Sequence, residues 1–250
     1  MDQSDLIKKI GLQSSDLSLL NQVFIHRSYV NEHRSEKLES NERLEFLGDA
    51  VLELVTTEYL YRNFSNNEGE LTNWRSALVK GPTLASVAQE LGLGQYLQLS
   101  RGEEKSGGRE KDYLLANTVE ALIGYIYLQG GYTKAQLFIH KFILVRLQTI
   151  LEKNLHIDSK SYFQETSQET LGVTPTYDVL SEEGPDHKKI FTMGVYLNGE
   201  LIAEGKGSSK QIAEQDAARN ALIAKGWFIN PGVTSKAPKK SPKKPKAAQE

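Results

Sequence analysis

The stretch SNERLEFLGDAVLELV, residues 40–55, has the apolar spacing of a helix, with leucines and valines along one side. The opposite side carries four carboxylates within an arc of about 80°, at a helical rotation of roughly 100° per residue. They are Glu42, Glu45, Asp49 and Glu53. Like charges three or four positions apart each cost about 0.2–0.5 kcal/mol. Two interpretations are open: a solvated acidic face, or a set of ligands for a divalent cation. The absence of Lys and Arg from the stripe favours the cation.

The stretch YLLANTVEALIGYIYL, residues 113–128, is apolar nearly all round, so we expect its helix to be buried. Glu120 lies in its middle, and Asn117 lies one turn earlier on the same face. A buried carboxylate is costly unless it is paired or binds a metal. Glu120 therefore either forms a salt bridge, with Arg27 or Arg43, or joins the acidic stripe. Carboxylates without Cys or His select a hard cation such as Mg²⁺. Such a site, with no side-chain nucleophile, indicates hydrolysis of a phosphodiester.

Apolar residues recur at helical spacing through most of residues 6–150. Turn-forming stretches such as NFSNNEGE, ELGLG and LQGGYT separate these segments, and no strand-like alternation stands out. We therefore expect an all-α N-terminal part. Its helices should lie around Leu19–Tyr29, Leu44–Leu60, Leu71–Val79, Leu84–Leu91, Tyr113–Leu128 and Ala135–Leu151.

The pattern changes after residue 156. SKSYFQETSQETLG predicts a helix and TPTYDVLSEEG a strand, and KKIFTMGVYLNGELIAEGKG predicts two strands joined by a tight turn at Asn198 and Gly199. SSKQIAEQDAARNALIAKG predicts a last helix with small residues on one side. The order α-β-β-β-α indicates an α+β fold. The residues expected to face its core are Phe191, Met193, Val195, Leu197, Ala213, Ala217 and Ala221.

Composition and charge narrow the class of protein. There is no cysteine and no run of eighteen apolar residues, so we expect neither disulfides nor a membrane span, and a cytoplasmic protein. Residues 156–230 hold 7 Lys+Arg and 11 Asp+Glu, net −4, whereas residues 231–250 hold 6 Lys and one Glu, net +5. Bulk charge therefore does not indicate nucleic-acid binding. The Lys/Pro-rich end cannot bury apolar surface, so we expect it to be disordered.

NERLEFLGDAVLELV, residues 41–55, closely resembles the signature of the ribonuclease III family. HRSYVNE, GELTNWRSALV and RGEEKSGGREKDYLLANTVEALIGYIYLQGG follow the same family, and residues 156–228 resemble its double-stranded-RNA-binding domain. The resemblance implies four segments. These are an all-α nuclease domain at 1–152, a linker at 153–160, an α+β RNA-binding domain at 161–229 and a disordered tail at 230–250.

The resemblance also implies an activity. Members of this family cut duplex RNA with Mg²⁺, for which Mn²⁺ can substitute, and leave 5′-phosphate and 3′-hydroxyl ends with short 3′ overhangs. They act as homodimers, and processing of rRNA and mRNA precursors is the expected role. By position, Glu42, Glu45, Asp49 and Glu120 match the acidic site, of which the last three are metal ligands. Glu53 lies outside it and is structural or solvated. Phe46 matches the aromatic residue that enters the partner subunit, although a plain core Phe is the alternative.

Asn117 departs from the family pattern, which often reads Asp-x-x-Glu where this chain has Asn117-Thr118-Val119-Glu120. Asn117 is nevertheless expected among the catalytic and metal-site residues. The amide offers a neutral oxygen in place of a charge, so Asn117 either orients a water in the metal site or lowers the metal affinity. The expected result is an active nuclease that needs, at most, more Mg²⁺. The alternative is a catalytically weakened duplex-RNA-binding protein.

Three contact points are expected in the RNA-binding domain, because such modules read the shape of duplex RNA across successive grooves. By resemblance they are Gln164 and Gln168 on the first helix, Pro185 and His187 in the loop after the first strand, and Ser209 and Lys210 at the start of the last helix. A plain polar surface is the alternative for the glutamines and for His187. Because the family usually has two or three basic residues in a row at the third point, we expect weak binding by the isolated domain, which the Lys-rich tail compensates.

The Gly-rich stretch EEKSGGREK carries Lys105, Arg109 and Lys111. These cations either follow the RNA backbone beside the acidic site or belong to a mobile, solvated loop.

Overall fold

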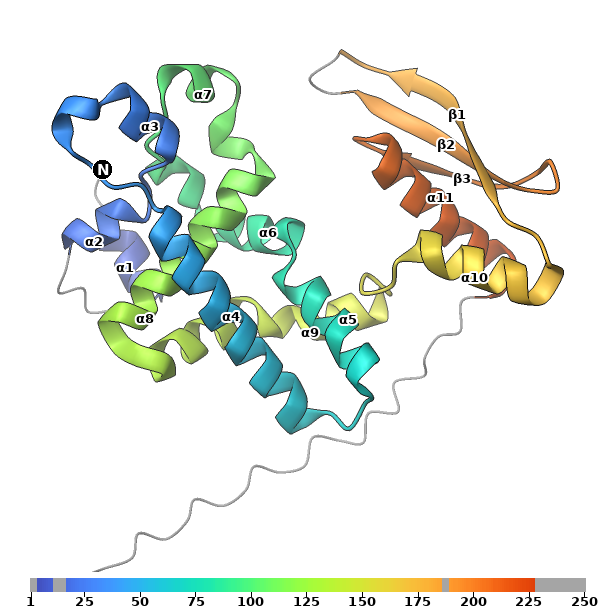
Figure 1. Cartoon of the computed structure of the whole chain (residues 1–250), viewed down its shortest axis with the longest axis horizontal. Coiled ribbons are helices and arrows are strands. Elements are labelled where there is room, and N and C mark those ends of the chain that lie inside the picture. Colours follow the sequence, from blue (N-terminus) through green and yellow to red (C-terminus); the bar gives the residue numbers. More distant parts are fainter. Residues whose placement is uncertain (1–3, 11–16, 186–188, 228–250) are drawn as a thin grey trace, which may run out of the picture. The chain divides into compact units, whose positions relative to one another are not determined.

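The computed structural model describes residues 4–10, 17–185 and 189–227. The chain divides into two compact units, residues 1–156 and 157–250 (Figure 1). None of the helices in the described ranges is both long and apolar enough to cross a bilayer.

The first unit is helical, as predicted. Its described residues contain no strand, only an isolated bridge between Ile25 and Gln98. The α-helices are α1 Ser4–Ile10, α2 Leu17–Gln22, α3 Arg27–Glu32, α4 Glu42–Asn63, α5 Glu68–Val79, α6 Gly81–Leu91, α7 Arg101–Lys105, α8 Asp112–Phe142 and α9 Leu147–Glu152. Short 3₁₀ turns are η1 Arg34–Glu36, η2 Leu93–Tyr96, η3 Gly108–Glu110 and η4 Leu144–Arg146.

One boundary differs from the sequence-based expectation, and another is confirmed. The segment expected as one helix around Leu19–Tyr29 is two, α2 and α3, because the chain between them pairs with a distant segment. There the Gln98 amide donates to the Phe24 carbonyl at 2.8 Å, and the His26 amide donates to the Gln98 carbonyl at 3.1 Å. The turn expected in LQGGYT is confirmed: Gly131 has φ 67° and ψ −171°, so the helical geometry is interrupted there and α8 consists of two helical parts joined at a kink.

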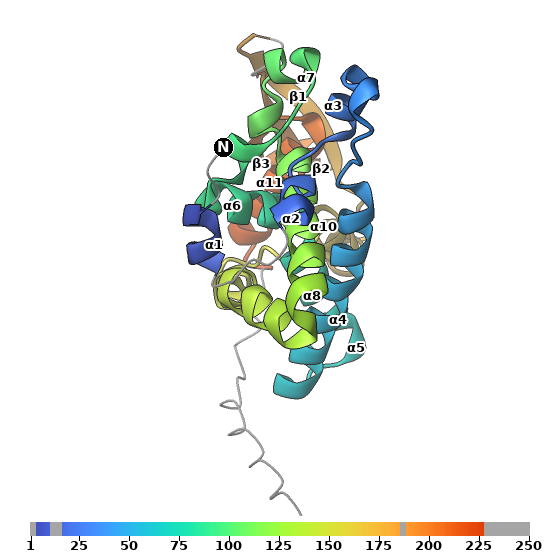
Figure 2. The same ribbon diagram turned by 90° about the vertical axis from the view of Figure 1, so that its left-hand side faces the viewer.

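Helices α4 and α8 lie side by side and form the centre of the first unit (Figures 1 and 2). Two glycines bring their backbones together. A Cβ on Gly48 would overlap the carbonyl oxygen of Glu120, and a Cβ on Gly124 would overlap that of Leu44. Only glycine permits so close an approach, and the acidic side of α4 therefore comes next to the middle of α8.

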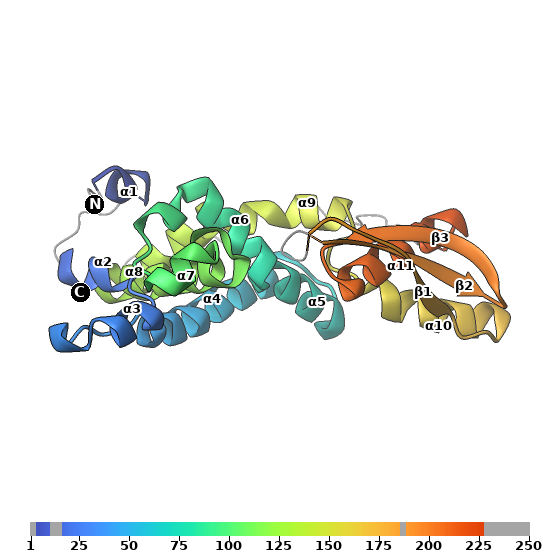
Figure 3. The same cartoon turned by 90° about the horizontal axis from the view of Figure 1, so that it is seen from above.

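The second unit has the predicted α-β-β-β-α order. Helices α10 Ser159–Leu171 and α11 Lys210–Ala224 cover one face of an antiparallel sheet (Figure 3). Its strands, in spatial order, are β1 Thr176–Glu183, β2 Ile190–Leu197 and β3 Glu200–Gly207.

The details of the second unit confirm the sequence pattern. Asn198 and Gly199 both have positive φ, 51° and 80°, as a tight hairpin turn requires. Six of the seven residues expected in the core are buried, and Phe191 is partly buried against them. A Cβ on Gly205 would overlap the backbone nitrogen of Ala217, which is why small residues line that side of α11.

Candidate active site

The acidic residues of the two central helices come together where α4 crosses α8. Glu45 and Asp49 lie on α4. Glu120 lies on α8, at the point where its backbone carbonyl meets Gly48 of α4. Their charges interact: burial raises the pKa of Glu120 to about 7, and Asp49 and then Glu45 add to the rise. In the described ranges Glu120 forms no ion pair. The interpretation of Glu120 as one half of a salt bridge with Arg27 or Arg43 is therefore wrong.

Glu45 is half-buried beside Asn117. Burial raises the pKa of Glu45, and so do its neighbours Glu42 and Asp49. A hydrogen bond from the Asn117 side chain lowers it, because the amide donates to the carboxylate and favours the ionised form. Asn117 thus acts on Glu45 as a hydrogen-bond donor, which an Asp at this position would not do when ionised.

The acidic stripe is partly neutralised from outside its own helix. Arg27 of α3 donates to both carboxylate oxygens of Glu42, at 3.0 and 3.1 Å, and holds the pKa of Glu42 below its usual value. Arg75 of α5 pairs with Glu53 at 3.0 Å, so Glu53 is a partly exposed side chain with a basic partner of its own. Two of the four acids of the stripe, Glu42 and Glu53, therefore have basic partners. Within the described ranges the acids that lack one are Glu45, Asp49 and Glu120.

A cavity of about 120 Å³ opens beside Glu45. Its polar walls come from α4 and α8 and from the segments before α3 and α4. They are the side chains of His26, Asn41, Glu42, Glu45, Asn117 and Thr118. Asn41 is buried and donates to the Val23 carbonyl at 3.1 Å, which fixes that wall.

The oxygen donors of this site fit a hard cation whose coordination shell is completed by water and substrate phosphate. Among the described residues no three His, Asp or Glu side chains stand close enough together to enclose a metal ion by themselves. Mg²⁺ does not require such a cage, because it keeps several waters and takes substrate phosphate as well as one or two carboxylates. Glu45, Asp49 and Glu120 carry uncompensated charge, and their oxygen donors suit Mg²⁺ rather than zinc.

Comparison with known proteins agrees with this geometry. Residues 16–147 match the family model described as ribonuclease-III-like, and residues 159–224 match the double-stranded RNA binding motif. The ribonuclease 3 of Pelotomaculum thermopropionicum is 45% identical over 224 residues, which are 89% of this chain and 93% of that protein. The chain belongs to the ribonuclease III family. Its activity is that of a double-strand-specific endoribonuclease, and the chemistry of this family depends on a metal ion.

Further relatives support the same family assignment. The ribonuclease 3 of Enterococcus faecalis is 44% identical over 220 residues, 88% of this chain and 95% of that protein. A solved nuclease domain of ribonuclease III from Campylobacter jejuni is 38% identical and covers 57% of this chain and 96% of its own, with a TM-score of 0.53. That structure is described as showing flexibility in the region involved in dimer formation.

Phe46 lies on α4 between the ribonuclease III acids Glu45 and Asp49. Its side chain is 80% exposed in the single chain. The alternative of a plain core Phe is therefore wrong, because a core side chain would be buried by its own subunit.

The positions expected to contact RNA lie partly within the described ranges. Gln164 and Gln168 are exposed on α10, where the Gln168 amide donates to Thr174 at 3.1 Å. Pro185 is exposed at the end of β1. His187 and the tail from residue 228 lie outside the described residues.

Charge at the start of α11 is lower than the resemblance implies. The Ser209 hydroxyl caps the helix by accepting from the Ile212 amide at 3.3 Å. Lys210 pairs with Glu182 at 3.4 Å, and Lys189 pairs with the same carboxylate at 3.3 Å. A phosphate at this helix start must therefore compete with Glu182 for Lys210.

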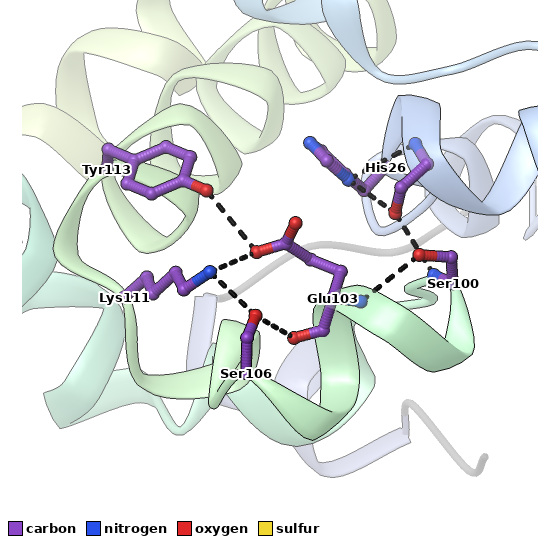
Figure 4. A network of polar contacts seen from close by, with 7 residues as sticks. His26, Ser100, Glu103, Ser106, Lys111 and Tyr113 are labelled. Atoms are coloured by element: carbon purple, nitrogen blue, oxygen red, sulfur yellow. Dashed lines mark hydrogen bonds and ion pairs between the residues drawn. The ribbon is translucent and has the colours of Figure 1, made fainter. Parts of the chain in front are cut away.

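The Gly-rich stretch is neither a solvated loop nor a free cationic arm. It forms α7 and η3, and two of its cations are paired within the protein (Figure 4). Lys111 donates to Glu103 at 2.6 Å, and Arg109 donates to Glu104 at 2.8 Å. The interpretation as a mobile, solvated loop is therefore wrong for these two residues, and contact with the RNA backbone stays a prediction. Lys105 is exposed.

Sequence analysis missed His26, which lines the cavity beside Glu45. The signal was present in HRSYVNE, where a ring that can accept a hydrogen bond stands directly before a helix.

Proposed function

We propose that this chain hydrolyses duplex RNA in a reaction that requires Mg²⁺, for which Mn²⁺ can substitute. Glu45, Asp49 and Glu120 hold the ion directly or through water, and Asn117 assists. The observation that carries this proposal is the backbone contact between Gly48 and Glu120, which brings three unpaired acids together. Such a charge cluster costs stability, and a divalent cation removes that cost.

The residues of the site have separable roles. When bound, the cation supplies charge neutralisation at the phosphodiester and makes an attacking water more acidic. Arg27 pins Glu42 at the edge of the site, and Asn117 donates a hydrogen bond to Glu45 that orients the carboxylate and opposes the rise in its pKa. Glu120 takes up a proton below about pH 7 when no cation is present, since its pKa is about 7. The RNA-binding domain holds the duplex through Gln164, Gln168, Pro185, His187, Ser209 and Lys210.

The finer features follow the family. The products are 5′-phosphate and 3′-hydroxyl ends with short 3′ overhangs, the natural substrates are rRNA and mRNA precursors, and the reaction takes place in the cytoplasm. Two copies act together, and each cuts one strand. The 80% exposure of Phe46 supports the dimer, because a large apolar side chain beside the site gains most by entering a partner subunit.

The proposed domain limits are those of the sequence: nuclease domain 1–152, linker 153–160, RNA-binding domain 161–229 and tail 230–250. The separation of the chain into residues 1–156 and 157–250 supports them.

One gel tests the reaction. A labelled duplex of about 60 base pairs and its single strands are incubated with the full chain in Mg²⁺ and in EDTA. The proposal expects cutting of the duplex alone, in Mg²⁺ alone, and Glu120→Ala should abolish cutting while it spares duplex binding. An uncut duplex in Mg²⁺ and in Mn²⁺ would refute the proposal.

A second candidate function is duplex-RNA binding with little cleavage, and Asn117 is the observation that favours it. Replacing Asn117 by Asp adds a charge and removes the hydrogen bond to Glu45. We expect Asn117→Asp to lower the Mg²⁺ concentration for half-maximal cleavage, from a wild type that already cuts. A wild type that stays inactive at high Mg²⁺, together with an active Asn117→Asp variant, would establish the second candidate.

A further inference from the structure

His26 begins α3 and uses one ring nitrogen to cap it. The Ser28 amide donates to His26 Nδ1 at 3.2 Å, and the Ser28 hydroxyl lies 2.8 Å from the same nitrogen. An amide N–H can only donate, so Nδ1 is an acceptor and carries no proton. The neutral ring therefore has its proton on Nε2.

A chain of hydrogen bonds holds this ring in place (Figure 4). The Ser28 hydroxyl accepts from the Ser100 amide at 3.0 Å, and the Ser100 hydroxyl accepts from the Glu103 amide at 3.2 Å. The Glu103 carboxylate is itself fixed by Lys111, at 2.6 Å. The orientation of His26 is thus set by α3 and α7 together. Burial also lowers the pKa of His26, against the charges of Glu103 and Glu42, which favours the neutral ring.

The second ring nitrogen has no hydrogen-bond partner among the described residues. In Figure 4 it is turned away from the Ser100 side of the network, and no described residue accepts a hydrogen bond from it. The ring lines the same cavity of about 120 Å³ as Glu45 and Asn117. Water occupies roughly 30 Å³ per molecule in the liquid, so a polar cavity of this size has room for a few ordered waters.

We propose that His26 is a positioning residue for Glu45. Its Nε2–H donates to a water in the cavity, and that water donates to the Glu45 carboxylate. Asn117 holds Glu45 from one side, and the water bound to His26 holds it from another. The carboxylate therefore keeps one orientation towards the cation. This role rests on the proposed function, in which Glu45 is a metal ligand. Groups that hydrogen-bond a metal ligand from behind commonly change metal affinity or activity by about 10–100-fold.

Two substitutions separate the cap from the Nε2 donor. His26→Asn keeps a side-chain acceptor at the position of Nδ1, because Asn is a good N-cap, but places no donor where Nε2 was. His26→Gln does the reverse, since its longer side chain reaches the position of Nε2 with an amide N–H and cannot cap as well. Both are made in the full chain and compared with wild type.

The proposal makes opposite predictions for the two variants. His26→Asn should keep its thermal midpoint in EDTA, lower kcat by about 10-fold or more, and weaken Mn²⁺ binding to the RNA-free protein. His26→Gln should lose about 2–4 °C in thermal midpoint yet recover much of the metal affinity and kcat. Duplex affinity in EDTA should be unchanged in both.

Three results would overturn the proposal. Wild-type Mn²⁺ affinity and kcat in His26→Asn would show that Nε2 has no role. Losses that follow the thermal midpoint, with His26→Gln worse in every assay, would assign His26 to structure alone. A loss of duplex affinity in EDTA would assign it to RNA. A wild type that cuts no duplex contradicts the proposed function instead, and the Mn²⁺ affinities still decide the role of His26.

Discussion

At the scale of single residues, the candidate site keeps acidic side chains near one another without basic partners, and the rest of the fold holds them there. Glu42 and Glu53 have arginine partners, whereas the described residues supply none to Glu45, Asp49 and Glu120. The pKa of about 7 at Glu120 shows that its ionised form is disfavoured in the folded chain. Active sites commonly lower stability in this way, because the charges are arranged for a ligand rather than for one another.

A neutral replacement of Glu120 should therefore stabilise the metal-free protein. The pKa of Glu120 is raised from 4.5 to about 7, so the cost of its charge is fully present above pH 7 and absent below pH 4.5. We expect Glu120→Gln to raise the free energy of unfolding in EDTA on the order of 1–2 kcal/mol at pH 8, allowing for partial solvent screening. At pH 4.5 the gain should disappear.

Urea unfolding of both proteins at the two pH values measures this effect. Equal stability at pH 8, or a gain of the same size at pH 4.5, would show that the charge of Glu120 is not disfavoured by its surroundings.

Residue types could be predicted from the sequence better than their partners. The four acids of α4 and Glu120 stood out because their spacing or their apolar surroundings were unusual. That Arg27 neutralises Glu42 depends on how α3 packs on α4, and no local pattern contains it. The cap of His26 on α3 is local, since the ring accepts from Ser28, but Ser28 is in turn anchored by Ser100 from a distant part of the chain.

At the scale of elements, the contact between α4 and α8 creates the site. We expect Gly48→Ala to destabilise the nuclease domain by about 2–3 kcal/mol or more, because the new Cβ overlaps the Glu120 carbonyl and forces the helices apart. Gly81→Ala, on α6 with no heavy atom within 4 Å of its Cβ position, is the matched control. Its gain in helix propensity is opposed by the restriction on a residue before Pro82, so it should change stability by less than about 1 kcal/mol.

Thermal and urea unfolding of the two variants, with Mn²⁺ affinity as a second readout, test this contact. If Gly48→Ala were as stable as Gly81→Ala and bound metal as tightly as wild type, the close approach of the two helices would not be needed for the site.

Helical spacing could predict most elements because the helices bury one apolar side each. It could not predict the interruption between α2 and α3, which arises from hydrogen bonds to Gln98. In the Gly-rich stretch, flexible composition was mistaken for flexible structure. Glu103 and Glu104 supply the partners that order the cations of this segment.

At the scale of the whole molecule, the proposed dimer depends on the exposed Phe46 beside the acids. We expect Phe46→Asp to convert a dimer into a monomer, because a charge cannot replace an apolar anchor in a buried pocket without a large desolvation cost. Leu137→Asp, at a side chain that is also exposed, 60%, but on α8, is the control and should remain dimeric.

Sedimentation at several protein concentrations distinguishes these outcomes, with circular dichroism to establish that both variants fold. A monomeric wild type, or a Phe46→Asp variant that stays dimeric, would contradict the proposed dimer.

The order of the two domains could be predicted from the sequence alone, because each has its own hydrophobic pattern. It could not decide the role of Phe46, whose apolar character fits a core as well as an interface.

The proposed function requires acids from α4 and α8 to bind a divalent cation jointly. Mn²⁺ binding to the RNA-free protein, followed by electron paramagnetic resonance, tests it most directly. We predict that Glu45→Gln, Asp49→Asn and Glu120→Gln each weaken binding by about 10-fold or more, whereas Glu53→Gln, on the same stripe but paired with Arg75, binds as wild type does. Unchanged Mn²⁺ affinity in folded Glu120→Gln would contradict the account, because the cation would then be held by α4 alone.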